Sequence, residues 1–340
     1  MKTAKSGLLK NNFFKLTVVF FLVRTLVTGI NGFAGSHLAD YLATVPGVEI
    51  FGITKSRDSD LGNLLGVKSR VKLFACDITG KRKLKKTIQE IAPDFVLHLA
   101  GQANIPASWK SPNETFRSNV LGTLNLLEAI NDSGTDPKIH LASSSEVYGK
   151  VKKTELPVTE QSLLCPFTPY GESKAEMEFL GKYFHQSFGL KVFITRAFNH
   201  SGPRSQEHYI LSDWSKQVAL IEKGEKRFLS VGNLNTQRDF SDVRDVVRAY
   251  WLALKKGKAG EAYNVCSGRG IAMKEILSKI KCSAKVKISV KVDKKKFRPT
   301  DLKIIFGSNK KIARQTGWKP KINFDRTIRD NLDYWREKVR

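Results

Sequence analysis

The sequence is poor in the residues that build disulfide frameworks and metal sites. Its cysteines are scattered along 340 residues, without a C-x-x-C pair, at Cys76, Cys165, Cys266 and Cys282. This spacing excludes a cysteine-rich secreted scaffold and a zinc-ribbon type of site. We therefore predict no metal centre and a reducing, cytoplasmic compartment.

Acidic residues are scarce compared with basic ones. The chain has 32 Asp and Glu against 58 Lys and Arg, which gives a net charge of +26. Such a surplus creates a positive field that attracts anionic ligands such as a nucleotide diphosphate. Dense basic runs, as in Lys81–Lys86, are also typical of solvated surfaces. No nucleic-acid recognition motif accompanies the charge, so we expect no nucleic-acid partner.

An apolar run long enough to cross a bilayer is also missing. The stretch Phe13–Val23 resembles the apolar part of a signal sequence, but Lys15 interrupts it and it merges with the first predicted strand. We expect no membrane partner. Residues 1–23 are interpreted as an N-terminal extension, either disordered or arising from a misassigned start.

Short apolar runs alternate with amphipathic stretches over residues 24–198, a pattern typical of repeated strand–helix units. The predicted strands are Thr25–Gly29, Glu49–Thr54, Val71–Ala75, Phe95–Leu99, Ile139–Ser143 and Val192–Arg196. The predicted helices are Gly35–Leu42, Leu84–Ile91, Pro112–Ile130 and Gly171–Ser187. The pattern predicts an α/β fold with a doubly wound parallel sheet of the Rossmann type.

The character of the chain changes after Asn199, where loops rich in Gly, Asn and Arg appear. Further helices are predicted at Ser212–Lys223, Val243–Leu254, Met273–Lys279, Asn309–Thr316 and Asp325–Lys338. We expect residues 199–340 to form mainly a smaller C-terminal substrate lobe, which could contribute further pieces to the sheet.

A glycine-rich turn links the first predicted strand to the first predicted helix. Gly29, Gly32 and Gly35 would let the chain turn tightly and let a pyrophosphate approach the backbone and the helix N-terminus. The spacing differs from G-x-G-x-x-G, but the position between strand and helix predicts a dinucleotide site. Asn31 and Phe33 lie on this turn and are predicted to contact the cofactor.

The second predicted strand ends without an acidic residue that could bind a ribose 2′-hydroxyl. Thr54 is followed by Lys55 and Arg57, two cations that could meet a 2′-phosphate or be ordinary loop residues. This favours NADP(H), with NAD(H) as the alternative.

Two more strands end in candidate cofactor contacts, because an open parallel sheet binds ligands at the carboxyl ends of its strands. Asp77 and Ile78 follow the third strand. Leu99, Ala100 and Gln102 follow the fourth.

Tyr170 and Lys174 are four residues apart and would share one face of a helix. A neighbouring ammonium favours phenolate, so we predict a lowered pKa for Tyr170 and a role as general acid or base. Ser144, in the cluster Ser143–Glu146, is the candidate hydroxyl donor to the same substrate oxygen.

Together these motifs resemble the extended short-chain dehydrogenase/reductases that act on nucleotide sugars. The resemblance is carried by the glycine turn, His98–Ala103, Ser143–Gly149 and Tyr170–Lys174, and it covers nearly the whole chain after Val23. It implies that Ser144, Tyr170 and Lys174 form the catalytic triad and that Lys174 also holds the cofactor ribose.

The resemblance implies further roles in the second half of the chain. His200 is expected beside the nicotinamide, and His98 is interpreted as a core histidine. The residues expected to hold the sugar nucleotide are Ser145, Asn199, Arg204, Arg238, Arg298 and Asp301. An ion pair between Arg298 and Asp301 is the structural alternative. The implied assembly is a homodimer packed through Pro112–Ile130 and Gly171–Ser187.

Within the family, the later motifs resemble the reductases of GDP-4-dehydro-6-deoxy-D-mannose, whose product is GDP-D-rhamnose. The main alternative is GDP-mannose 4,6-dehydratase, in which a glutamate two places after the Ser or Thr shuttles a proton; Glu146 occupies that place. Another epimerase or dehydratase of the family is a broader alternative. A non-catalytic nucleotide or nucleic-acid binding module is opposed by the intact Ser144, Tyr170 and Lys174.

Overall fold

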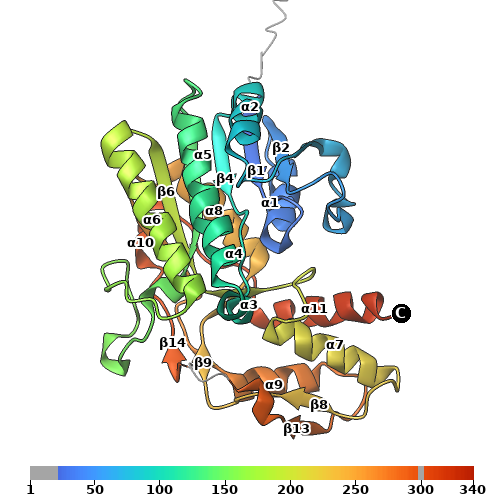
Figure 1. The fold of residues 1–340 in the computed structure, drawn as a ribbon. Helices are drawn as coiled ribbons and strands as arrows, with labels where there is room; N and C mark the ends of the chain where they lie inside the picture. Colours follow the sequence, from blue (N-terminus) through green and yellow to red (C-terminus); the bar gives the residue numbers. More distant parts are fainter. Residues whose placement is uncertain (1–21, 298–301) are drawn as a thin grey trace, which may run out of the picture.

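The computed structural model describes residues 22–297 and 302–340, and its centre is a seven-stranded parallel sheet (Figure 1). The strand order is β11-β6-β5-β4-β1-β2-β3. The strands are β1 (Val23–Thr28), β2 (Val48–Thr54), β3 (Val71–Ala75), β4 (Phe95–His98), β5 (Lys138–Ser144), β6 (Lys191–Ala197) and β11 (Ala262–Val265). The six strands predicted from the sequence are therefore confirmed, with ends that shift by at most two residues.

Helices cover both faces of the sheet because neighbouring residues of each strand point to opposite sides. In β1, Val27 packs into the cluster with α1 (Phe33–Ala43), α8 (Val243–Lys256) and α10 (Lys310–Thr316). Leu26 packs into the opposite cluster, formed with α2 (Lys81–Ile91), α5 (Gly122–Asn131) and α6 (Pro169–Phe188). This arrangement confirms the predicted doubly wound α/β fold.

A smaller C-terminal region lies at the carboxyl-end side of the sheet and has its own apolar core (Figure 1). Its helices are α7 (Ile210–Glu222), α9 (Met273–Cys282) and α11 (Phe324–Lys338). Short strands pair here as β13 (Val290–Val292) with β8 (Leu229–Val231), β10 (Phe240–Asp242) with β7 (Asn199–Ser201), and β9 (Gln237–Arg238) with β12 (Ile271–Ala272) and β14 (Ile304–Ile305). The second half of the chain also supplies β11 and α8 to the main sheet layers.

The prediction of one continuous helix over Pro112–Ile130 is wrong in detail. The segment is divided into α4 (Pro112–Phe116), a π-helical turn (Arg117–Leu121) and α5. The π turn carries Asn119, which is buried and donates from Nδ2 to the Gln102 carbonyl at 2.9 Å and to Ser173 Oγ at 2.9 Å. The widened turn therefore lies where one side chain links a loop of the site to α6.

The sequence patterns also missed α3 (Ile105–Lys110), a helix shorter than two turns.

The predicted N-terminal extension lies outside the described residues up to position 21, and β1 begins at Val23. Within the described part of the chain, none of the helices is long and apolar enough to cross a membrane.

Candidate active site

The turn between β1 and α1 has a shape that only glycine allows at two positions. Gly29 has φ of +69°, and a Cβ there would lie 2.8 Å from the Ala100 Cα. A Cβ on Gly35 would lie 2.2 Å from the Gly29 carbonyl oxygen, so α1 begins in direct contact with the turn. Close packing of this kind brings the N-terminus of α1 to the carboxyl ends of the strands.

The N-terminus of α1 can receive an anion. Its N-cap residue is Gly32, and its own first turn carries no acidic side chain. A Cβ on Gly32 would meet only the Gly29 carbonyl oxygen, at 3.2 Å, so the outer side of this residue is open. The turn therefore fits the pyrophosphate of a dinucleotide, which helix N–H groups and the helix dipole favour.

Asn31 and Phe33 lie on the turn, but both make contacts within the protein. The Asn31 amide donates to the Asp60 carbonyl at 3.0 Å. The Phe33 ring is stacked on His200, with ring centroids 5.9 Å apart and planes 9° apart. This stacking places His200 beside the glycine turn, and burial lowers the pKa of its imidazole.

The predicted cations lie at the end of β2, where Thr54 is buried and Lys55 and Arg57 are exposed. Asp77, after β3, accepts from the Thr79 backbone and hydroxyl at 2.9 Å each. Burial would raise the pKa of Asp77, but these hydrogen bonds and the charge of Lys55 outweigh burial and lower that pKa. Lys55 is thus close enough to Asp77 to act on its carboxylate.

The loop after β4 is held to β1 by side-chain hydrogen bonds. The Ala100 N–H donates to Thr28 Oγ1 at 3.1 Å. His98 contacts the hydroxyls of Thr28 at 2.8 Å and Thr123 at 3.1 Å, so its interpretation as a core histidine is confirmed. The Gln102 side chain is bound to the backbone of Asn104.

Ser144, Tyr170 and Lys174 come together where β5 ends and α6 begins. Ser144 is the last residue of β5, and Tyr170 and Lys174 follow one another along the first turns of α6. The Ser144 hydroxyl lies close enough to the Tyr170 phenol to act on its pKa. The Lys174 ammonium lies 5.9 Å from the Tyr170 ring centroid and donates to the Ala142 carbonyl at 2.8 Å.

The predicted lowering of the Tyr170 pKa is wrong for this environment. Burial raises the pKa of the Tyr170 phenol, Tyr209 and Glu146 act in the same direction, and the neighbouring Ser144 hydroxyl opposes them. Burial also lowers the pKa of Lys174 to about 8. The sequence showed the two groups as neighbours but not how completely the protein removes both from water.

Ser145 and Glu146 form the turn after β5. Ser145 is buried, and the Glu146 N–H donates to Ser144 Oγ at 3.2 Å. Glu146 influences the pKa of Tyr170, so its carboxylate lies close to the triad. The roles predicted for these two residues stay predictions.

The residues predicted to hold the sugar nucleotide in the second half of the chain have different surroundings in the structure. Asn199 is exposed at the start of β7. The Arg238 guanidinium donates to the Leu302 carbonyl at 2.7 Å. Arg204 instead turns towards α1, where it donates to the Asn63 carbonyl and to His37, each at 2.8 Å, and pairs with Asp40.

The contacts of Arg204 do not favour its predicted role in binding the sugar nucleotide. Its side chain is occupied by α1 and by the loop at Asn63. The predicted residues Arg298 and Asp301 lie outside the described residues.

The sequence patterns missed two residues next to the triad. Asn119 ties the loop at Gln102 to α6, as described above. Tyr209 donates to the Ala103 carbonyl at 3.2 Å and acts on the pKa of Tyr170. Asn119 lies within the predicted helix Pro112–Ile130, and Tyr209 lies in a loop with no distinguishing pattern.

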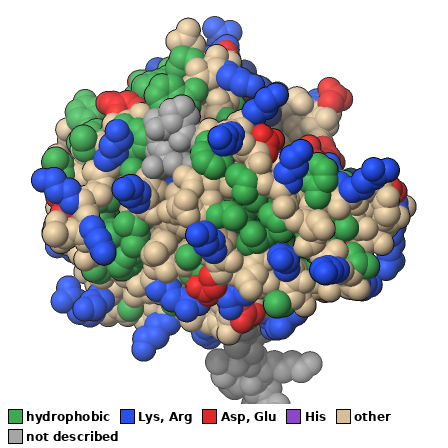
Figure 2. All heavy atoms as spheres, turned by 90° about the horizontal axis from the view of Figure 1, so that it is seen from below, with side chains coloured by type: hydrophobic (Ala, Val, Ile, Leu, Met, Phe, Trp, Pro, Cys, Tyr) green, Lys and Arg blue, Asp and Glu red, His purple; other side chains and the backbone are tan. Residues whose placement is uncertain are grey.

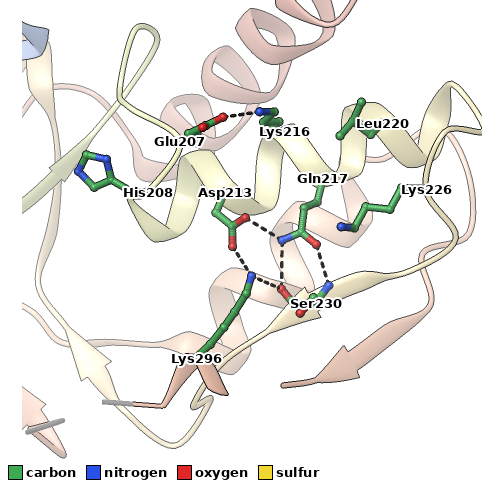
Figure 3. A pocket seen from close by; sticks show the side chains of 9 residues that line it. All are labelled: Glu207, His208, Asp213, Lys216, Gln217, Leu220, Lys226, Ser230 and Lys296. Carbon is green, nitrogen blue, oxygen red and sulfur yellow. Dashed lines mark hydrogen bonds and ion pairs between the residues drawn. The ribbon is translucent and has the colours of Figure 1, made fainter. Parts of the chain in front are cut away.

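A cavity of about 530 Å³ lies along α7, close to the loop that carries Tyr209 (Figure 3). Asp213 accepts from Gln217 at 2.9 Å and from Lys296 at 2.7 Å. Gln217 also bonds both backbone groups of Ser230 on β8. Lys216 and Lys226 also line the cavity, and Lys216 pairs with Glu207, so the cavity presents cations, carboxylates and an amide together.

Comparison with known proteins gives the family. The model of GDP-mannose 4,6 dehydratase matches residues 26–331. GDP-6-deoxy-D-mannose reductase of Pseudomonas aeruginosa is 34% identical over 318 residues, covering 93% of this chain and 98% of the relative. The chain belongs to the GDP-mannose 4,6-dehydratase family.

Two solved structures have the same fold. RMD from Pseudomonas aeruginosa, complexed with NADPH, matches with a TM-score of 0.81 and 31% identity, covering 93% of this chain and 100% of that one. UDP-glucose 4-epimerase of Thermus thermophilus, complexed with NAD, has a TM-score of 0.81 and 31% identity, covering 92% and 99%. The chain is thus an extended short-chain dehydrogenase/reductase that modifies nucleotide sugars, as the motifs indicated.

The glycine turn yields a prediction for Gly35→Ala. The added Cβ would overlap backbone atoms of Gly29 and Ile30, so α1 must move away from the turn. We expect a loss of about 1–3 kcal/mol in the free energy of unfolding, the usual cost of overpacking. Chemical denaturation measures it.

Gly66→Ala is the matched control, because a Cβ at Gly66 has nothing within 4 Å. Equal stability of the two variants would contradict the packing argument.

Proposed function

We propose that this protein is an NADPH-dependent reductase that converts the C4 carbonyl of GDP-4-dehydro-6-deoxy-D-mannose to a hydroxyl, giving GDP-D-rhamnose. The observation that carries the proposal is the near full-length similarity to the Pseudomonas reductase. The Ser144, Tyr170 and Lys174 constellation supplies the groups that carbonyl reduction requires.

The protein's own residues would handle the proton and the developing negative charge. The bound nicotinamide cofactor would supply the hydride to C4. A raised pKa keeps the Tyr170 phenol protonated at neutral pH, so it can donate its proton to the C4 oxygen. Ser144 would donate a hydrogen bond to the same oxygen, and the Lys174 ammonium would stabilise the phenolate that remains.

The cofactor would lie along the carboxyl ends of β1, β2 and β4. Gly29, Gly32 and the N-terminus of α1 would hold the pyrophosphate. Lys55 and Arg57 are exposed at the end of β2, where a 2′-phosphate could bind them. Asp77 and Ala100 border the same edge.

The nucleotide of the substrate would extend into the C-terminal lobe, towards the cavity along α7. Lys216 and Lys296 pair with Glu207 and Asp213 of the same cavity, and Lys226 adds a further positive charge that would favour a diphosphate. Figure 2 shows the face seen from below in Figure 1, where Lys and Arg side chains are spread widely and acidic ones are few. Asn199 and Arg238 remain the proposed contacts among the described residues.

GDP-mannose 4,6-dehydratase is the second candidate. Glu146 lies beside Tyr170, where dehydration would use a carboxylate to move a proton, and the matching family model is that of the dehydratase. In that reaction the cofactor is oxidised and reduced within one cycle, so no net nicotinamide is consumed.

The reaction is tested with purified protein and two substrates. We expect NADPH consumption with GDP-4-dehydro-6-deoxy-D-mannose, and no loss of water from GDP-mannose. Mass spectrometry of the products together with NADPH absorbance measures both. Dehydration of GDP-mannose without added nicotinamide would instead establish the second candidate.

Tyr170→Phe is the matched variant for this assay. It removes the donated proton with little change in packing, and we expect kcat to fall by about 10²–10⁴-fold. Phe179→Tyr, an exposed change on the same helix, should retain activity.

Cofactor preference is tested with Lys55→Glu. Losing a charge-assisted hydrogen bond and adding a repelling carboxylate should raise the KM for NADPH by about tenfold or more, while the KM for NADH changes little. Steady-state kinetics with both cofactors measures the ratio. Lys256→Glu, an exposed change at the end of α8, is the charge-matched control; an unchanged ratio in Lys55→Glu would remove Lys55 from the phosphate site.

We also propose a homodimer packed through α5 and α6 with the adjoining π turn. Leu121, Phe179 and Tyr183 leave 42%, 53% and 52% of their surfaces exposed on these elements. Placing a charge in such an apolar interface should dissociate it, so Tyr183→Glu should sediment as a monomer. Leu163→Glu, at an 81% exposed position outside these helices, should remain dimeric. A monomeric wild-type protein would contradict the proposal.

A further inference from the structure

Helix α6 holds strand β5 at two consecutive residues just before Ser144. The Lys174 ammonium donates to the Ala142 carbonyl at 2.8 Å. One turn later, the carboxylate of Glu178 accepts the Ser143 hydroxyl at 2.5 Å. The spacing between Ser144 on the strand and Tyr170 on the helix is therefore fixed by two cross-links from a single helix face.

Arg196 holds the Glu178 carboxylate from the other side. It lies on β6, opposite Ser143 in the strand register. Its Nε and Nη2 donate to the two carboxylate oxygens at 2.9 and 2.7 Å. The two side chains are 2% and 0% exposed, so neither charge has water as an alternative partner.

The same guanidinium reaches the turn that follows Ser144. Arg196 Nη1 donates to the Tyr148 hydroxyl and to the Glu160 carbonyl, each at 3.1 Å. The Tyr148 hydroxyl in turn donates to Asn264 Oδ1 on β11, at 2.6 Å. Ser144 is thus bracketed, by Ser143 before it and Tyr148 after it, and both are tied to one buried ion pair.

We propose that the Glu178–Arg196 pair positions the reaction centre: it aligns Ser144 with Tyr170 and keeps a carboxylate one helical turn from Lys174. The inference builds on the proposed reduction, in which these three groups act on one oxygen. Glu178 and Arg196 are positioning residues, because they act through Ser143, Tyr148 and Lys174.

The Glu178 carboxylate stabilises the charged ammonium of Lys174, whereas the neighbouring histidines are neutral. Glu178 raises the pKa of Lys174, against the stronger lowering by burial. His98 on β4 and His140 on β5 also face Lys174, but burial lowers the pKa of both to about 3, so they are neutral. Tyr148, which faces Glu178 and Arg196, is neutral as well, since burial raises its pKa to about 12.

The test is Glu178→Gln in the full-length enzyme. Misplacement of Ser144 relative to Tyr170 should lower kcat on the order of 10²-fold, with little change in KM. The alkaline limb of the kcat–pH profile should move to lower pH, because the Lys174 ammonium loses its neighbouring carboxylate and its pKa falls. Glu178→Asp keeps the negative charge but shortens the side chain by one methylene. Its kcat should fall, while the alkaline limb of its kcat–pH profile should stay at the wild-type position.

Glu222→Gln is the matched control for a broken ion pair. Glu222 accepts Arg336 through both oxygens at 2.7 and 2.6 Å, in the C-terminal lobe. This variant should lose thermal stability and keep the wild-type kcat and pH profile. If Glu178→Gln does not fold, Ser143→Ala removes one cross-link and leaves the ion pair, and kcat should fall up to about tenfold at nearly normal stability.

A readout without substrate separates this proposal from the proposed function. NMR of isotope-labelled lysine side chains, with the resonance assigned from Lys174→Met, should show Lys174 titrating at lower pH in Glu178→Gln than in wild type. Absence of reduction by the wild-type protein would reject the function but leave this comparison valid. An unchanged Lys174 titration, or a wild-type kcat in both Glu178→Gln and Ser143→Ala, would overturn the positioning role.

Discussion

The contact between α6 and the carboxyl end of β5 is the constraint on which the rest of the site depends. A hydroxyl on a strand and a phenol on a helix can serve one oxygen only if the two elements keep a fixed register. The Lys174 bond to the Ala142 carbonyl provides that register, and it needs a buried ammonium. The site therefore requires a charge in the core, and the surrounding fold must keep that charge stable.

Burial has opposite effects on the two titrating groups of the triad. It raises the pKa of Tyr170 and lowers that of Lys174, so it favours the neutral form of each. In such a poorly solvated place, charges that form during a reaction interact strongly with fixed dipoles and ions. In the proposed reduction, a phenolate formed at Tyr170 would therefore depend on Ser144 and on the Lys174 ammonium for its stabilisation.

The sequence predicted the sheet well, because buried parallel strands read as apolar runs such as Phe95–Leu97 in β4. The sequence also predicted that Ser144, Tyr170 and the glycine turn lie at one edge of the sheet, because the carboxyl ends of its parallel strands meet there. The π turn at Asn119 could not be predicted, since local propensity favours a continuous helix. The direction of Arg204 depends on its left-handed backbone, with φ of +68°, and on partners over 140 residues away in sequence. The pKa of Tyr170 depends on burial, which a pair spacing does not describe.

The position of Glu146 bears on the direction of the chemistry. A carboxylate near Tyr170 opposes formation of phenolate and so favours the protonated phenol. A protonated phenol is the form needed to donate to a carbonyl oxygen that receives hydride. Dehydration begins instead with oxidation of a hydroxyl, for which Tyr170 must first accept a proton as phenolate. Burial and Glu146 both disfavour phenolate, so the surroundings of Tyr170 hold it as the protonated phenol, the form that the proposed reduction would use.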